Sequence, residues 1–121
     1  MKIFISHISE EKNLAIIFKE WIETTFLGQL SVFVSSDPES IPAGNKWLED
    51  ITSALQESKL LIILYSPLSK NRPWINFDTG CGWIKNIPII PICHSGLKPN
   101  QIGQPISSFH GLEMEDKNLS N

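Results

Sequence analysis

The sequence predicts a single α/β domain, with a mostly parallel sheet of four to five strands covered by helices on both faces. Short apolar segments alternate with segments in which apolar residues recur every three or four positions. This order, β-α-β-α-β-α-β followed by a loop and a short strand, requires right-handed crossovers between parallel strands. The length of 121 residues suits one domain, and 41% apolar with 19% charged residues argues against disorder.

Four apolar segments and a short fifth are expected to form the strands. The segment KLLIILY is the most apolar of them and is expected at the centre of the sheet. The segment IPIIPIC contains two prolines, which cannot donate to a strand ladder, so it is expected towards the sheet edge. The predicted strands are 2–6, 30–35, 59–65, 87–93 and 109–114.

Three helices are expected between these strands. Ser9 is expected to cap the first helix, which ends near Gly28. Pro73 suits the first position of the third helix, and Gly80 and Gly82 within it predict close packing of that helix on the sheet. The apolar faces are Leu14, Ile17, Phe18, Trp21, Ile22 and Thr25 in the first helix and Trp47, Leu48, Ile51, Ala54 and Leu55 in the second.

The charge distribution and the known motifs exclude several classes of function. The net charge is −3 and the basic residues are scattered, which disfavours direct binding of nucleic acid. The sequence contains no GxxxxGK[ST], GxGxxG, GxSxG or HExxH motif. Two cysteines are too few for a disulfide framework. No metal site is expected, because no zinc spacing fits Cys81, Cys93, His94 and His110.

Ligands of such folds bind beyond the carboxyl ends of the strands, so the loops after the strands are the candidate site. Trp74 and Asp78 are four residues apart and share a helix face near that end of the sheet. A carboxylate beside an indole in a cleft suits sugar hydroxyls or a developing positive charge. The spacing alone, however, favours a core tryptophan with a solvated aspartate one turn on. His7 and Asp37, at the tips of the first two strands, face the same crevice.

Several segments, in order, carry a resemblance to one family. FISHISEEK, SVFVSSDPESIPAGNKWLEDITSAL, LLIILYSP, RPWINFDTGCGW and IPIIPI together resemble a bacterial TIR (Toll/interleukin-1 receptor) domain, over about residues 2 to 114. The resemblance implies a flavodoxin-like fold and cleavage of NAD⁺ to nicotinamide and ADP-ribose or a cyclised form. It places Asp78 as the catalytic acid and Trp74 as a stacking residue, and it places Ser6 and His7 against the nicotinamide riboside. NAD⁺ is then a substrate, and no cofactor is expected.

The resemblance also implies an assembly. Asp37 is expected to contact substrate and opens a loop that includes Ile41, Pro42 and Gly44, and in similar domains this loop reaches a neighbouring copy. We therefore expect activation by oligomerisation, in bacterial defence against phage. The domain is expected over residues 1–114, with 115–121 as a polar tail or the start of a linker to a missing sensor domain. A cytoplasmic location away from membranes is expected.

Asp78 departs from the glutamate that the family usually has at this position. The carboxylate is set back by one methylene, about 1.5 Å, and a displacement near 1 Å can cost about a hundredfold in rate. Three explanations stay open: a compensating shift of the helix, slower or different chemistry, or a domain that only assembles. The hypotheses are thus an NAD⁺-cleaving enzyme, a TIR interaction module without catalysis, and a nucleoside-transferring relative on a similar sheet.

Overall fold

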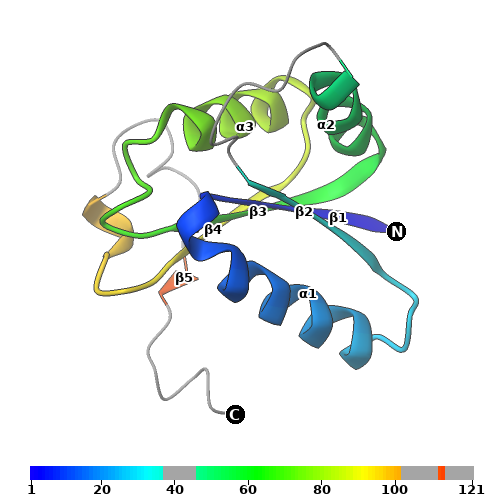
Figure 1. Cartoon of the computed structure of the whole chain (residues 1–121), viewed down its shortest axis with the longest axis horizontal. Helices are drawn as coiled ribbons and strands as arrows, with labels where there is room; N and C mark the ends of the chain where they lie inside the picture. Colours follow the sequence, from blue (N-terminus) through cyan, green and yellow to red (C-terminus); the bar gives the residue numbers. More distant parts are fainter. Residues whose placement is uncertain (37–45, 102–111, 114–121) are drawn as a thin grey trace.

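The computed structural model describes residues 1–36, 46–101 and 112–113 of the chain. Its strands form one parallel sheet in the order β2-β1-β3-β4-β5 (Figure 1). The strands are β1 (Lys2–His7), β2 (Ser31–Ser36), β3 (Ser58–Tyr65), β4 (Ile89–Cys93) and β5 (Leu112–Glu113). The helices are α1 (Lys12–Thr25), α2 (Lys46–Glu57) and α3 (Pro73–Ile84), with short 3-10 turns η1 (Ser9–Glu11) and η2 (Pro99–Gln101).

The strand order confirms the predicted α/β fold and locates its switch point. The chain passes from β1 to β2 on one side and then returns to place β3 on the other side of β1. The order 2-1-3-4-5 is that of flavodoxin-like folds, whose ligands bind beyond the carboxyl ends of the strands where the order reverses. The carboxyl ends of β1 and β3 are therefore where a ligand site is expected.

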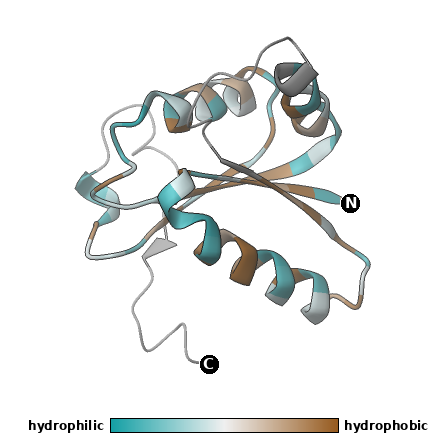
Figure 2. Ribbon diagram, in the orientation of Figure 1, coloured by the Kyte–Doolittle hydropathy of each residue, from teal (hydrophilic) through white to brown (hydrophobic). Residues whose placement is uncertain are grey.

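Helices cover both faces of the sheet, and each face has its own core (Figures 1 and 2). Side chains of β1 alternate between the two cores, as a strand buried on both faces requires. The core under α2 and α3 contains Phe4, Ile8, Ile51, Ala54, Leu55, Leu61, Ile63, Tyr65, Ile75, Cys93 and Leu97. The core over α1 contains Ile3, Ile5, Ala15, Ile22, Val32, Ile62, Leu64 and Ile92.

The first helix differs from its predicted form at both its start and its buried face. Ser9 does not cap α1, because the 3-10 turn η1 intervenes and Glu11 occupies the N-cap position. Ile17 and Trp21 were expected to face the core, yet they are 58% and 59% exposed. The buried residues of α1 are Ala15 and Ile22, so the buried stripe is narrower than the apolar stripe in the sequence.

The end of α1 is a Schellman turn with a leucine where glycine is usual. The N–H of Gly28 donates to the carbonyl of Glu23, and the N–H of Leu27 donates to the carbonyl of Thr24. Leu27 has a φ of 53° and is 87% exposed, so it combines a left-handed backbone with a solvated apolar side chain.

The third helix begins as predicted, with Pro73 in its first turn and Arg72 at the N-cap. It packs on β3 through a buried polar contact, in which the hydroxyl oxygens of Tyr65 and Thr79 are 3.1 Å apart. The two glycines of the helix differ. A Cβ on Gly82 would lie 2.5 Å from Leu61 Cδ2, which confirms close packing, whereas a Cβ on Gly80 would meet no atom within 4 Å.

The two ends of the sheet are closed differently. β4 lies next to the last strand, towards the edge as its prolines predict, and β5 pairs with it over two residues. At the other end, α1 caps the outer side of β2 at Val32. Lys19 Nζ donates to the Val32 carbonyl at 2.7 Å, and the Val32 N–H donates to Glu23 Oε2 at 2.9 Å. Lys19 and Glu23 also form an ion pair of 2.9 Å.

Candidate active site

The carboxyl end of β1 meets α3 through one buried hydrogen bond. Ser6 Oγ donates to Asp78 Oδ2 at 2.5 Å, and both residues are 0% exposed. The second carboxyl oxygen of Asp78, Oδ1, is buried and has no hydrogen-bond partner in the described part of the chain. A buried polar atom without a partner is costly, so its presence beside the switch point marks a candidate site.

Burial governs the protonation of Asp78. Loss of solvent raises its pKa from 3.8 to about 7, and the hydrogen bond from Ser6 opposes that rise. At neutral pH the carboxyl group therefore exchanges between its neutral and its ionised form. A carboxyl group with one oxygen held and the other free suits stabilisation of a cationic sugar or acceptance of a hydrogen bond from a hydroxyl.

Two predicted site residues lie close in the chain to this contact. His7 follows Ser6 on β1, and Trp74 lies one turn before Asp78 on α3. His7 is 1% exposed, and its Nδ1 lies 2.8 Å from the Ile8 carbonyl oxygen. Trp74 is half-buried on the first turn of α3 and stacks on Phe77 with ring centroids 5.7 Å apart. The indole packs against the core under α2 and α3, and its Nε1 atom is buried. Only the part of the ring that remains exposed could stack on an aromatic ligand.

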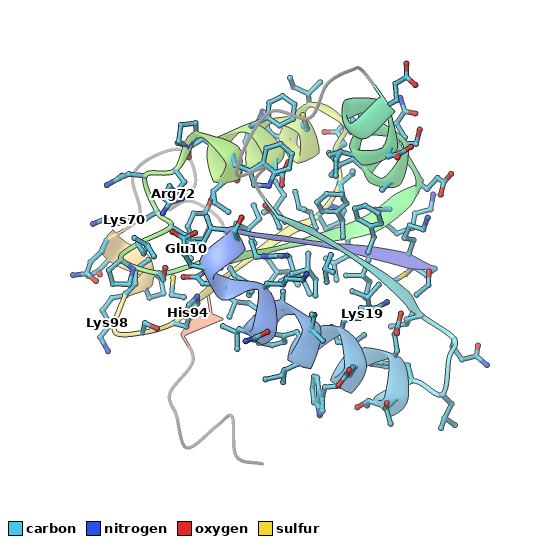
Figure 3. The ribbon with its side chains drawn as sticks, in the orientation of Figure 1. Glu10, Lys19, Lys70, Arg72, His94 and Lys98 are labelled. Carbon is cyan, nitrogen blue, oxygen red and sulfur yellow. The ribbon has the colours of Figure 1, made fainter. Side chains whose placement is uncertain are left out.

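A second polar cluster joins three strand ends around η1 (Figure 3). Ser66 Oγ, just after β3, donates to Glu11 Oε2 at 2.5 Å, and His94 Nε2, just after β4, lies 3.2 Å from Glu11 Oε1. The side chains of His94 and Glu11 are only 8% and 11% exposed. Next to them, Arg72 pairs with Glu10 at 2.5 Å. No sequence motif pointed to this cluster, because its members are distant in the chain and each is ordinary in its own segment.

The structure brings together some of the residues predicted for the site. Ser6 and Asp78 are in direct contact, and His7 adjoins them in the chain. The predicted residues Asp37, Ile41, Pro42 and Gly44 lie outside the described residues, as does His110. Within the described ranges, no three His, Cys, Asp or Glu side chains gather as a metal site would require.

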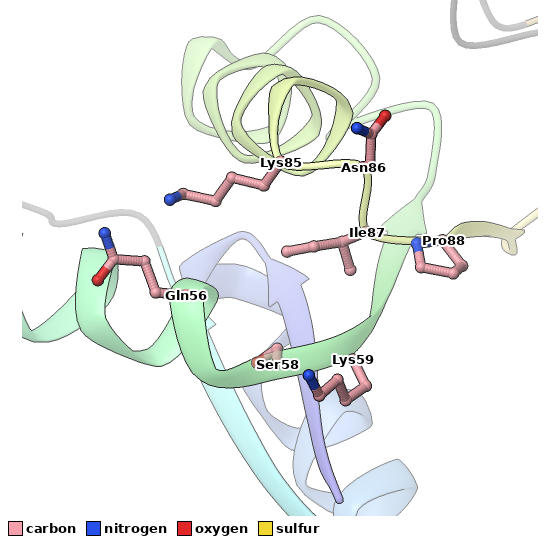
Figure 4. A pocket seen from close by; sticks show the side chains of 7 residues that line it. All are labelled: Gln56, Ser58, Lys59, Lys85, Asn86, Ile87 and Pro88. Atoms are coloured by element: carbon pink, nitrogen blue, oxygen red, sulfur yellow. The ribbon is translucent and has the colours of Figure 1, made fainter.

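A hollow of 380 Å³ lies at the opposite, amino end of the sheet (Figure 4). It is polar and lies between the ends of α2 and α3, where Lys59 and Lys85 can offset the negative ends of the two helix dipoles. Its lining residues are Gln56, Ser58, Lys59, Lys85, Asn86, Ile87 and Pro88. None of the predicted site residues lines it, so it is separate from the candidate active site.

The fold and this site define an α/β domain of the kind that binds ligands at a topological switch point. A family model described as TIR domain matches residues 3–119, and the chain belongs to the TIR domain family. No curated protein matches the sequence. The described part of the chain contains no helix both long and apolar enough to cross a bilayer.

Among solved structures, a nucleoside-processing enzyme shares the fold. It is the 2-deoxyribosyltransferase of the psychrotolerant bacterium Bacillus psychrosaccharolyticus, reported as a biocatalyst for nucleoside synthesis. The TM-score is 0.65 and the identity is 19%, with 99% of this chain and 90% of that chain covered. At this identity the likeness establishes the fold.

Proposed function

We propose that this TIR domain cleaves the N-glycosidic bond of NAD⁺ and releases nicotinamide, with Asp78 as the catalytic carboxylate. The observation that carries the proposal is the buried carboxyl group of Asp78, which Ser6 holds by one oxygen while the other has no partner in the described part of the chain. Membership of the TIR family supports it. The shared fold with a 2-deoxyribosyltransferase supports chemistry at an N-glycosidic carbon on this kind of sheet.

The reaction places few demands on the protein. Breaking the bond between nicotinamide and ribose builds positive charge on the sugar, while nicotinamide leaves neutral and needs no proton. An ionised Asp78 facing that charge stabilises the transition state, and Oδ1 is the oxygen left to do so. Trp74 stacks on the substrate. Water then adds to the sugar to give ADP-ribose, or the adenine of the same molecule adds to give a cyclic product.

Ionisation of Asp78 sets the pH dependence of this reaction. Its pKa of about 7 means that the active, ionised form increases as the pH rises through neutrality. The rate should therefore rise with pH and level off above about pH 8, because few of the Asp78 carboxyl groups remain protonated there.

We further propose that self-association activates the domain, within a cytoplasmic defence system that has a fused or separate sensor. Apolar side chains exposed on both layers of the fold support contacts between copies. On α1 these are Ile17 and Trp21, and on α3 they are Trp83 and Ile84, at 56% and 81% exposure. Activity per molecule should then increase with protein concentration.

The test is release of nicotinamide from NAD⁺ by clustered protein. The natural chain, Asp78→Ala and Asp78→Glu are compared, with Asp50→Ala as a control at an exposed carboxylate of α2. Asp78→Ala should lose at least about a hundredfold in rate, whereas Asp50→Ala should match the natural chain. Equal turnover by the natural chain and Asp78→Ala would refute the assignment.

A second candidate function is a TIR interaction module without catalysis. The complete burial of Asp78 and its aspartate in place of the usual glutamate favour it. This candidate predicts self-association with no release of nicotinamide at any protein concentration. A 2′-deoxynucleoside supplied with a different free base, in place of NAD⁺, tests the third class, since transfer of the deoxyribosyl group to that base would identify a nucleoside-transferring enzyme.

A further inference from the structure

We infer that Glu11 is a positioning residue for the candidate site. Glu11 holds the loop between β3 and α3 and thereby positions Asp78. The structural part of the inference stands on the contacts of Glu11 with Ser66 and His94. Its kinetic part rests on the proposed function.

Both carboxyl oxygens of Glu11 are engaged in a nearly buried position. Oε2 accepts the hydroxyl of Ser66 at 2.5 Å, and Oε1 lies 3.2 Å from His94 Nε2. The Glu11 side chain is 11% exposed, so water cannot readily replace these partners. Removing the carboxylate would leave Ser66 Oγ and His94 Nε2 without this hydrogen-bond partner. Losing a buried partner costs more free energy of folding than losing an exposed contact.

The loop that Glu11 holds is internally braced. Ser66 and Ser69 exchange hydrogen bonds, because the N–H of each donates to the hydroxyl oxygen of the other at 2.9 and 3.0 Å. The N–H of Arg72 donates to the Ser69 carbonyl at 2.9 Å. A displacement of Ser66 would therefore pass along the loop to Arg72, the N-cap of α3.

The same turn also contacts the far end of the loop. Glu10 pairs with Arg72 (Figure 3). The two consecutive glutamates of η1 therefore hold Ser66 at the start of the loop and Arg72 at its end. The Glu10 contact is exposed and weak, whereas the Glu11 contacts are nearly buried. Of these two glutamates, Glu11 therefore holds the loop more strongly.

The loop matters to the site because α3 begins where it ends. Pro73 follows Arg72 directly, and Asp78 lies on the same helix five residues later. Ser6, just before η1 in the chain, supplies the hydrogen bond to Asp78. A shift of α3 by about 1 Å would lengthen that bond and misplace the carboxylate, and such a shift can cost about a hundredfold in rate.

The experiment compares Glu11→Ala and Glu11→Gln with the natural chain. Glu23→Ala is the matched control, because Glu23 also makes two side-chain contacts but joins α1 to β2. Amide hydrogen exchange is followed over residues 66–72, and kcat and KM are measured for nicotinamide release. Glu11→Ala should raise exchange over 66–72 and lower kcat about ten- to a hundredfold, with a smaller change in KM.

The other variants separate positioning from general loss of stability. Glu11→Gln keeps an oxygen acceptor and a side chain of the same length, so it should recover most of the kcat and the protection. Glu23→Ala should lose stability while its kcat and the exchange over 66–72 stay unchanged. Unchanged exchange over 66–72 in Glu11→Ala, or an equal loss of kcat in Glu23→Ala, would overturn the inference. A natural chain that releases no nicotinamide would refute the proposed function, while the exchange result would still decide whether Glu11 holds the loop.

Discussion

Replacing Asp78 by asparagine should remove a pH-dependent cost to the stability of the fold. In the folded chain the pKa of Asp78 is about 7, against an ordinary value of 3.8 that applies when the chain unfolds. The folded state therefore binds the proton more tightly. The stability that this proton provides is fully present below about pH 4 and is lost as the pH rises through about 7.

The magnitude follows from the separation of the two pKa values. They differ by about three pH units, and each unit corresponds to about 1.4 kcal/mol, so ionising Asp78 in the fold costs about 4 kcal/mol above both values. Between about pH 5 and pH 8 the change amounts to about 2–3 kcal/mol. The amide of the Asp78→Asn variant cannot ionise, so this variant lacks the change. Its amide nitrogen would be buried without a described acceptor, at a cost of about 1–3 kcal/mol that does not vary with pH.

Urea unfolding of the natural chain and of Asp78→Asn at the two pH values measures this difference. The free energy of unfolding of the natural chain should fall by about 2–3 kcal/mol more than that of the variant between about pH 5 and pH 8. The two proteins differ only at residue 78, so the comparison isolates Asp78. Parallel pH dependence in the two proteins would show that Asp78 is not held in a desolvated site.

Four further substitutions test three other features. Ser6→Ala should move the midpoint of the pH–rate profile to higher pH, because the hydrogen bond that lowers the pKa of Asp78 is lost; an unmoved midpoint would contradict this. Leu27→Gly should raise the free energy of unfolding by about 1 kcal/mol, as it relieves a positive φ; urea unfolding checks it. Gly80→Ala should stabilise the protein by about 1 kcal/mol, whereas Gly82→Ala should destabilise it by about 1 kcal/mol because its methyl group would meet the core. Equal effects at the two glycines would refute the packing argument.

The helices and strands could be predicted from local sequence patterns, but the extent of their burial could not. Pro73 predicted the start of α3, because a fixed φ and a missing N–H suit the first turn of a helix. The apolar spacing of α1 predicted a helix correctly but not how much of it is covered. Trp21 lies on the apolar stripe and yet is 59% exposed. Which residues of the stripe are buried depends on the elements that pack against the helix, and the sequence of the helix does not specify these.

The strand order alone predicts which strand ends meet at the site, but it does not predict every side-chain contact between them. Ser6 and Asp78 are 72 residues apart, and parallel strands joined by right-handed crossovers place both near one edge of the sheet. Glu11 and His94 are 83 residues apart, and their contact depends on the turn that follows β1 and on the end of β4. No periodicity or motif specifies such a pair, because each residue alone is typical of a solvated loop.

The contacts of Lys19 and Glu23 with Val32 limit how copies of this domain can join. Val32 is on β2, at the end of the strand order, where an outward N–H and carbonyl would otherwise offer a template for a strand of another chain. Both groups are already bonded to α1. A neighbouring copy that extended the sheet past Val32 would first have to displace an ion pair. Growth of an assembly by continuous sheet extension is therefore opposed at that register, and contacts through helix faces are favoured.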